Sequence, residues 1–192
     1  MASFNQRFGV NRFAADEYYR RALIAFSRRD FDKAIANLND AIEEVPRNPD
    51  YRSARGMVHL EEAEYDEAEV DFAEAVRLNK YDVLGNYGLG FVALKKKNYE
   101  KAKAHLMQAY YAQPKRPETI FSLAVACYYL GDLVNATNYM GQVHALFEAA
   151  NDKRKAESAR WLRELAKHVA RPGRPSGALP AAAQPRLPLG DE

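Results

Sequence analysis

The fold is decided by two consecutive stretches, residues 49–82, PDYRSARGMVHLEEAEYDEAEVDFAEAVRLNKYD, and residues 83–116, VLGNYGLGFVALKKKNYEKAKAHLMQAYYAQPKR. They align without a gap, and the alignment extends to residues 15–48 before them and 117–150 after them. An alanine recurs every 34 residues, at Ala34, Ala68, Ala102 and Ala136. Small residues stand 12 positions earlier each time, at Ala22, Gly56, Gly90 and Ala124. A fixed internal period of this length is typical of repeat architectures.

Each repeat contains two helical patterns. Positions are counted from the first residue of each 34-residue stretch, so that Pro49 and Val83 are position 1. In the first half, the residues at positions 4, 7, 8 and 11 lie on one side of a helix, which predicts a packing stripe. The second half begins with a large apolar residue, which is Phe31, Tyr65, Tyr99 or Leu133. A residue suited to capping a helix precedes each of them, namely Asp30, Glu64, Asn98 and Asp132. We therefore expect antiparallel helix pairs that are stable only when stacked on one another.

This pattern resembles the tetratricopeptide repeat, which has a 34-residue period, small residues at positions 8 and 20, and a proline near position 32. Pro46 and Pro114 match that proline, whereas Lys80 replaces it and no tryptophan occurs at position 4. The resemblance covers residues 15–148 and implies an all-α, right-handed solenoid of helical hairpins. Its four repeats are residues 15–48, 49–82, 83–116 and 117–150.

Three further segments flank the repeats. Residues 1–14 are expected to form an N-terminal arm that carries Phe4, Phe8, Val10 and Phe13. Within residues 151–170, a helix from Asp152 to Val169 is expected to cap the stack through a stripe of Ala159, Leu162, Leu165, Ala166 and Val169. Trp161 lies beside that stripe, either folded over the capping interface or exposed as a partner anchor. Residues 171–192, rich in proline, glycine and alanine, are expected to form a flexible tail.

In proteins of this family the first helix of each repeat lines a concave groove, so the resemblance places the binding site there. Positions 5, 9 and 12, which we call the groove positions, lie on the side of the helix away from the packing stripe. Ser53 stands at one of these twelve positions. The other eleven are apolar or aromatic and are the predicted partner-binding residues: Tyr19, Leu23, Phe26, Met57, Leu60, Tyr87, Phe91, Leu94, Phe121, Val125 and Tyr128.

A continuous exposed lane of such residues is expected to be covered by something. The candidates are a partner's apolar peptide or amphipathic helix, the N-terminal arm, or a second copy of the chain. The favoured function is therefore a non-enzymatic protein-interaction adaptor, with a chaperone or assembly factor, or a self-associating scaffold, as alternatives. Family members that bind acidic carboxylate tails use lysine, asparagine and arginine at places where this chain has Tyr19, Leu23, Ala54, Leu84 and Gly88. The resemblance thus disfavours an acidic C-terminal peptide.

Composition excludes several other classes of function. A net charge of +2 argues against nucleic acid as the main partner, and no stretch approaches the roughly 20 apolar residues of a membrane span. The four histidines are far apart, and we expect no metal, cofactor or catalytic site. The single cysteine, Cys127, is expected to be a buried structural thiol. A lone cysteine and the absence of a recognisable signal sequence predict a cytoplasmic protein.

Overall fold

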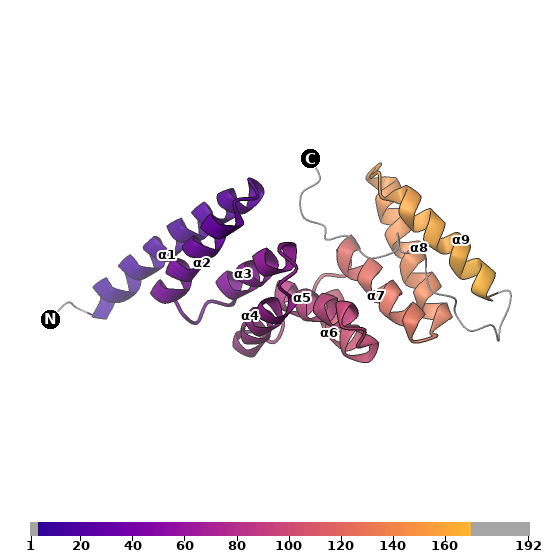
Figure 1. Cartoon of the computed structure of the whole chain (residues 1–192), viewed down its shortest axis with the longest axis horizontal. Helices are drawn as coiled ribbons and strands as arrows, with labels where there is room; N and C mark the ends of the chain where they lie inside the picture. The colour runs from indigo at the N-terminus through magenta and orange to yellow at the C-terminus, as the bar shows by residue number, and fades with distance from the viewer. Residues whose placement is uncertain (1–3, 170–192) are drawn as a thin grey trace. The chain divides into compact units, whose positions relative to one another are not determined.

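The computed structural model describes residues 4–169, with side chains described from Arg12 onward. This part of the chain forms nine α-helices and no β-strand (Figure 1). The helices are α1 (Phe4–Ser27), α2 (Phe31–Glu44), α3 (Pro49–Glu61), α4 (Tyr65–Leu78), α5 (Val83–Lys95), α6 (Tyr99–Ala112), α7 (Pro117–Tyr129), α8 (Leu133–Ala149) and α9 (Lys155–Val169). None of the described helices is both long and apolar enough to cross a membrane. The expected tail, residues 171–192, lies outside the described residues.

The helices follow the sequence period closely. Each expected repeat contains one helix pair, α1 with α2, α3 with α4, α5 with α6, and α7 with α8. The second helices begin at Phe31, Tyr65, Tyr99 and Leu133. The all-α array of helical hairpins that the sequence predicts is therefore confirmed. Because α1 begins at Phe4, residues 4–14 form the first part of this helix.

Side-chain caps fix the start of three second helices. The carboxylate of Asp30 accepts a hydrogen bond from the backbone nitrogen of Lys33 at 3.3 Å. Asn98 and Asp132 accept equivalent bonds from the third residue after them, both at 3.2 Å. Glu64 stands at the same position of the second repeat but makes no such bond. Capping bonds of this kind satisfy backbone N–H groups that the helix itself leaves without acceptors.

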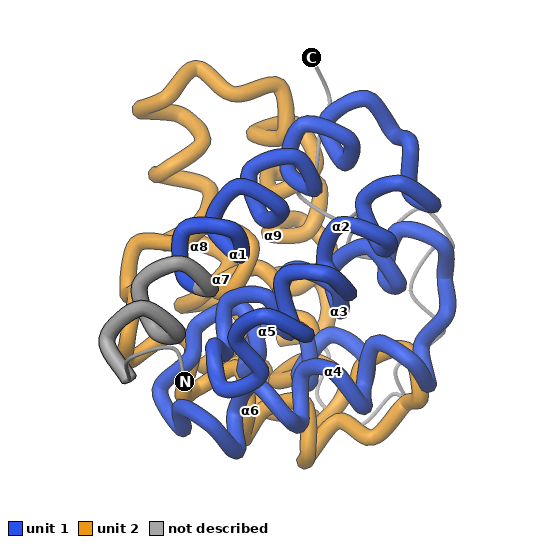
Figure 2. The backbone as a smooth tube through the Cα atoms, turned by 90° about the vertical axis from the view of Figure 1, so that its left-hand side faces the viewer, with its two compact units in different colours: residues 1–92, 192 blue, residues 93–191 orange. Residues whose placement is uncertain are grey.

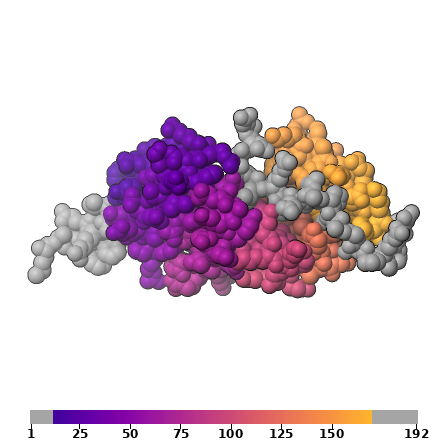
Figure 3. Space-filling view, in the orientation of Figure 1, coloured from indigo at the N-terminus to yellow at the C-terminus, as the bar shows by residue number. Residues whose placement is uncertain are grey.

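The described residues divide into two compact units, unit 1 up to residue 92 and unit 2 from residue 93 (Figure 2). In unit 1, α1 packs on α2, α2 on α3, and α3 on α4. In the space-filling view the atoms of this unit form a continuous surface coloured indigo to magenta (Figure 3). The fully buried residues of unit 1 include Leu38, Tyr51, Val58 and Phe72. The recurring alanines Ala34 and Ala68 are completely buried, as expected where two helices approach closely.

In unit 2, α6 packs on α7, α7 on α8, and α8 on α9. Leu106, Leu123, Met140 and Leu165 are fully buried there. α9 is shorter than the expected Asp152–Val169 helix and turns a different face to the core, with Ser158, Trp161 and Leu165 buried and Val169 54% exposed. The expected capping stripe is therefore wrong in part: Leu165 is buried as expected, whereas Ala166 and Val169 are exposed and the large indole ring of Trp161 is buried instead.

Candidate functional site

The groove positions differ greatly in exposure, and most of them are covered. Leu23 is 47% exposed, and Tyr19 and Phe26 are half-buried. The other eight predicted residues have at most 8% of their surface exposed: Met57, Leu60, Tyr87, Phe91, Leu94, Phe121, Val125 and Tyr128. The expectation of a continuous exposed apolar lane is therefore wrong for these eight residues. A helical wheel places a side chain on one helix but does not account for neighbours that cover it.

In unit 2 the covering residue is Trp161 of α9. Its ring lies 6.0 Å from the ring of Phe121 and 5.8 Å from that of Tyr128, edge to face in both cases. The Tyr128 hydroxyl also lies 3.2 Å from Nε2 of His168 on the same helix as Trp161. Trp161 is only 3% exposed, so it belongs to the capping interface and is not an exposed anchor. The fourth repeat therefore offers no accessible apolar surface at these positions.

In unit 1, accessible groove positions occur on α1. Asp16, Tyr19 and Leu23 are spaced three and four residues apart, which places them on one side of the helix. The Tyr19 ring contacts Tyr51 of α3 at 5.1 Å between centroids. We call the surface formed by Asp16, Tyr19, Leu23 and Phe26 the α1 face. The three apolar members of this face were predicted from the sequence, whereas the exposed carboxylate of Asp16 was not identified there.

Besides Asp16, the carboxylates of Asp50 and Asp82 belong to this region of unit 1. The Asp16 carboxylate accepts a hydrogen bond from the Tyr51 hydroxyl at 2.9 Å. Asp50 is exposed, whereas Asp82 is 7% exposed and accepts hydrogen bonds from the Ser53 hydroxyl and the Gly85 nitrogen, both at 2.5 Å. Among the described residues, no basic side chain forms an ion pair with any of the three. The sequence contained a signal for this feature, because Asp16 and Asp50 occupy the same position of successive repeats.

The pKa values reflect this local excess of negative charge. Asp50 is exposed as a residue, but partial burial of its carboxyl raises the pKa of that group, and the charge of Asp82 raises it further. The pKa of the Tyr19 hydroxyl is also raised, first by burial and then by the charges of Asp50 and Asp82. A raised pKa means that the surroundings disfavour the charged form of the group. A cation placed beside these groups would reverse that effect.

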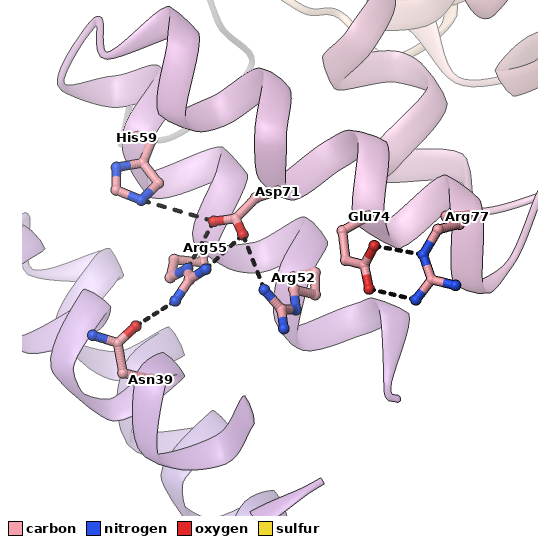
Figure 4. Close-up of polar contacts among 7 residues, drawn as sticks. All are labelled: Asn39, Arg52, Arg55, His59, Asp71, Glu74 and Arg77. Carbon is pink, nitrogen blue, oxygen red and sulfur yellow. Dashed lines mark hydrogen bonds and ion pairs between the residues drawn. The ribbon is translucent and has the colours of Figure 1, made fainter. Parts of the chain in front are cut away.

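A second polar cluster lies between α3 and its neighbours (Figure 4). The buried Asp71 carboxylate of α4 accepts two hydrogen bonds from Arg55, both at 2.7 Å, while Arg52 and His59 lie 3.8 Å from its oxygens. Arg55 also donates to the side-chain oxygen of Asn39 in α2 at 2.5 Å. Arg52, Arg55 and His59 occupy positions 4, 7 and 11 of their repeat. The prediction of an apolar packing stripe is therefore wrong for the second repeat. Its basic side chains at these positions lie around the buried carboxylate of Asp71.

The described part of the chain holds neither a cluster of metal-ligating side chains nor an exposed thiol. No cluster of three histidine, cysteine, aspartate or glutamate side chains there could hold a metal ion. Cys127 is fully buried, and its burial raises the pKa of the thiol to about 11. A thiol with such a pKa carries almost no nucleophilic thiolate near neutral pH. The prediction of a buried structural cysteine is confirmed.

Helix pairs that recur at a fixed period, and that pack in chain order within each unit, define a helical-hairpin repeat protein. The chain belongs to the tetratricopeptide repeat family: two profiles described as tetratricopeptide repeat match residues 19–83 and 85–116. Neither profile describes a catalytic domain, and the family generally mediates protein–protein interactions. No curated protein sequence matches the chain significantly.

Solved structures share the fold at low sequence identity. MamA from Desulfovibrio magneticus RS-1 is 16% identical with a TM-score of 0.61, and the match covers 82% of this chain and 96% of that one. YrrB, described as a TPR protein with an unusual peptide-binding site, is 20% identical with a TM-score of 0.60, covering 80% and 90%. The first TPR of Spaghetti (RPAP3), bound to the HSP90 peptide SRMEEVD, is also 20% identical with a TM-score of 0.60, covering 62% and 95%. These similarities show the fold alone.

Proposed function

We propose that the chain is a non-enzymatic protein-interaction adaptor that binds an apolar peptide or amphipathic helix of a partner on the α1 face. The observation that carries this proposal is the exposure of Leu23, 47%, at a groove position flanked by the half-buried rings of Tyr19 and Phe26. An exposed leucine between two half-buried aromatic rings offers a place where an apolar side chain of a partner loses water on binding. YrrB is described as having a peptide-binding site and the Spaghetti repeat binds an HSP90 peptide, which supports a peptide as the class of ligand.

The peptide itself is not carried over from those relatives. The basic and amide side chains that grip an acidic carboxylate tail are replaced here by Tyr19, Leu23, Ala54, Leu84 and Gly88. The eight buried groove positions are also left out of the proposed contact, because they offer little surface to a partner. The proposed site is therefore smaller than a groove that runs through all four repeats.

Affinity capture with the full chain and a Leu23→Gln variant tests this proposal. The matched control is Val134→Gln, which replaces an apolar residue of α8 that is 73% exposed and lies outside the groove positions. We expect the chain and the control to recover the same proteins, and Leu23→Gln to lose them while keeping its helical circular dichroism. Equal recovery by a folded Leu23→Gln variant would contradict the proposal.

A further inference from the structure

The α1 face is apolar at its centre and acidic at its edge. Tyr19, Leu23 and Phe26 supply the apolar surface, and the exposed carboxylate of Asp16 lies on the same side of the helix, seven residues before Leu23. Asp50 is the second residue of α3, one repeat period after Asp16. Tyr51 beside it contacts Tyr19 through its ring and Asp16 through its hydroxyl. Any segment bound at Leu23 therefore has carboxylates within reach.

These carboxylates have no cationic partner among the described residues, although basic residues stand close by in sequence. Arg20 and Arg21 of α1 both pair with Glu17, at 2.8 and 2.9 Å. Arg12 acts on the Tyr51 hydroxyl through its charge but forms no ion pair with Asp16. The buried carboxylate of Asp82 adds a negative charge that acts on both Asp50 and Tyr19. Among the described side chains, this side of unit 1 therefore carries negative charge that a cationic ligand would neutralise.

We propose that the partner segment bound on the α1 face carries a lysine or arginine next to an apolar residue. The apolar side chain packs on Leu23 between Tyr19 and Phe26, and the cation pairs with Asp16 and Asp50. This inference rests on the proposed function and adds the chemistry of the ligand to it. Charge complementarity favours a basic segment, since an acidic or uncharged one leaves the repulsion between Asp50 and Asp82 in place.

Peptide selection on the immobilised full chain tests this inference and does not require the natural partner to be identified first. The probe is a phage-displayed library of random dodecapeptides, selected at low salt. Enriched peptides are then synthesised and their affinities measured by fluorescence polarisation. We expect them to contain lysine or arginine beside a leucine, phenylalanine or other large apolar residue. Enrichment of acidic or wholly uncharged peptides that bind at Leu23 would overturn the inference.

Two variants measure the charged contact. Asp16→Asn with Asp50→Asn removes both exposed charges, and the control Asp32→Asn with Asp40→Asn removes two exposed charges of α2. We expect the first variant to weaken binding by about three- to tenfold at low salt, which corresponds to two exposed ion pairs. The loss should shrink in about 0.5 M salt, where exposed charges are screened. Equal affinities of the two double variants for the selected peptides would overturn the inference.

The Leu23→Gln variant separates this inference from the proposed function. Selected peptides whose binding depends on Leu23 but not on the two aspartates refute the cationic ligand while the adaptor proposal stands. Peptides whose binding is unaffected by Leu23→Gln refute the adaptor proposal itself. Light scattering on the same samples gives a further decisive outcome. A dimer that Leu23→Gln dissociates would assign the face to a second copy of the chain and overturn the inference.

Discussion

Phe72 of α4 lies so close to Gly88 of α5 that a Cβ atom at Gly88 would come within 2.3 Å of the Phe72 ring. The same ring lies 2.8 Å from the place of a Cβ at Gly56 of α3. Phe72 is completely buried, so the ring has little room to move away. The two glycines therefore provide space that this packing requires, although glycine is intrinsically unfavourable inside a helix.

Replacing Gly88 by alanine should destabilise the protein. The added methyl group overpacks the core around Phe72, and we expect a loss of about 1–3 kcal/mol in the free energy of unfolding. Thermal unfolding followed by circular dichroism measures the effect. Gly141→Ala in α8 is the matched control, because a Cβ there meets nothing within 4 Å, and it should be neutral or slightly stabilising. An unchanged melting temperature for Gly88→Ala would show that Phe72 can shift at little cost.

The Asp71 cluster predicts a strong dependence on one carboxylate. Asp71→Asn leaves the half-buried Arg55 without its doubly hydrogen-bonded partner, and we expect a loss of about 3 kcal/mol in urea denaturation. Glu74→Gln breaks the pair between Glu74 and Arg77 (Figure 4). The Arg77 side chain is 69% exposed, so this change should cost less than about 1 kcal/mol. Similar losses in the free energy of unfolding for the two variants would contradict the conclusion that Asp71 stabilises this cluster.

Trp161 is the single tryptophan of the chain, so its fluorescence reports on the docking of α9. Native protein should emit at the short wavelengths of a buried indole, with a shift to longer wavelengths on unfolding. Trp161→Ala removes the ring that packs on Phe121 and Tyr128, and we expect it to cost about 3–5 kcal/mol. Tyr111→Ala in α6, where the side chain is 67% exposed, should have little effect. An emission wavelength of the native protein equal to that of free tryptophan would contradict the burial of Trp161 in α9.

The thiol of Cys127 should react slowly with Ellman's reagent in the folded protein and fully in urea. Its pKa is raised from 9.0 to about 11 by burial, so the folded state holds the proton more tightly than the unfolded state. The resulting contribution to stability is complete below pH 9 and is lost as the pH rises from about 9 to 11. Cys127→Ser should weaken this part of the pH dependence. Rapid labelling of native protein at pH 8 would contradict the burial.

The sequence predicted the arrangement of helices well because a 34-residue period fixes every helix pair at once. Once Tyr65 is placed at the start of a helix, Phe31, Tyr99 and Leu133 follow. The candidate site was predicted less well, because exposure depends on neighbours that the repeat does not encode. Trp161 lies outside the repeats, and it covers Phe121 and Tyr128.

Charged residues caused the remaining differences between prediction and structure. Arg52 and Arg55 stand where a packing helix normally carries apolar residues, and the buried Asp71 that accommodates them lies on the next helix. A search for apolar residues alone also passes over Asp16 and Asp50. Their recurrence at one repeat position marks them in the sequence, but only the contact of Tyr51 with Tyr19 and Asp16 places them beside the α1 face.

Photo-cross-linking from α1 tests the central claim most directly. A photoreactive benzoylphenylalanine replaces Leu23 in the full chain, and the same group at Val134 in α8 is the control. With a selected basic-apolar peptide present, we predict a cross-linked product from position 23 and none from position 134. Cross-linking at position 134 alone, or equally at both positions, would contradict binding on the α1 face.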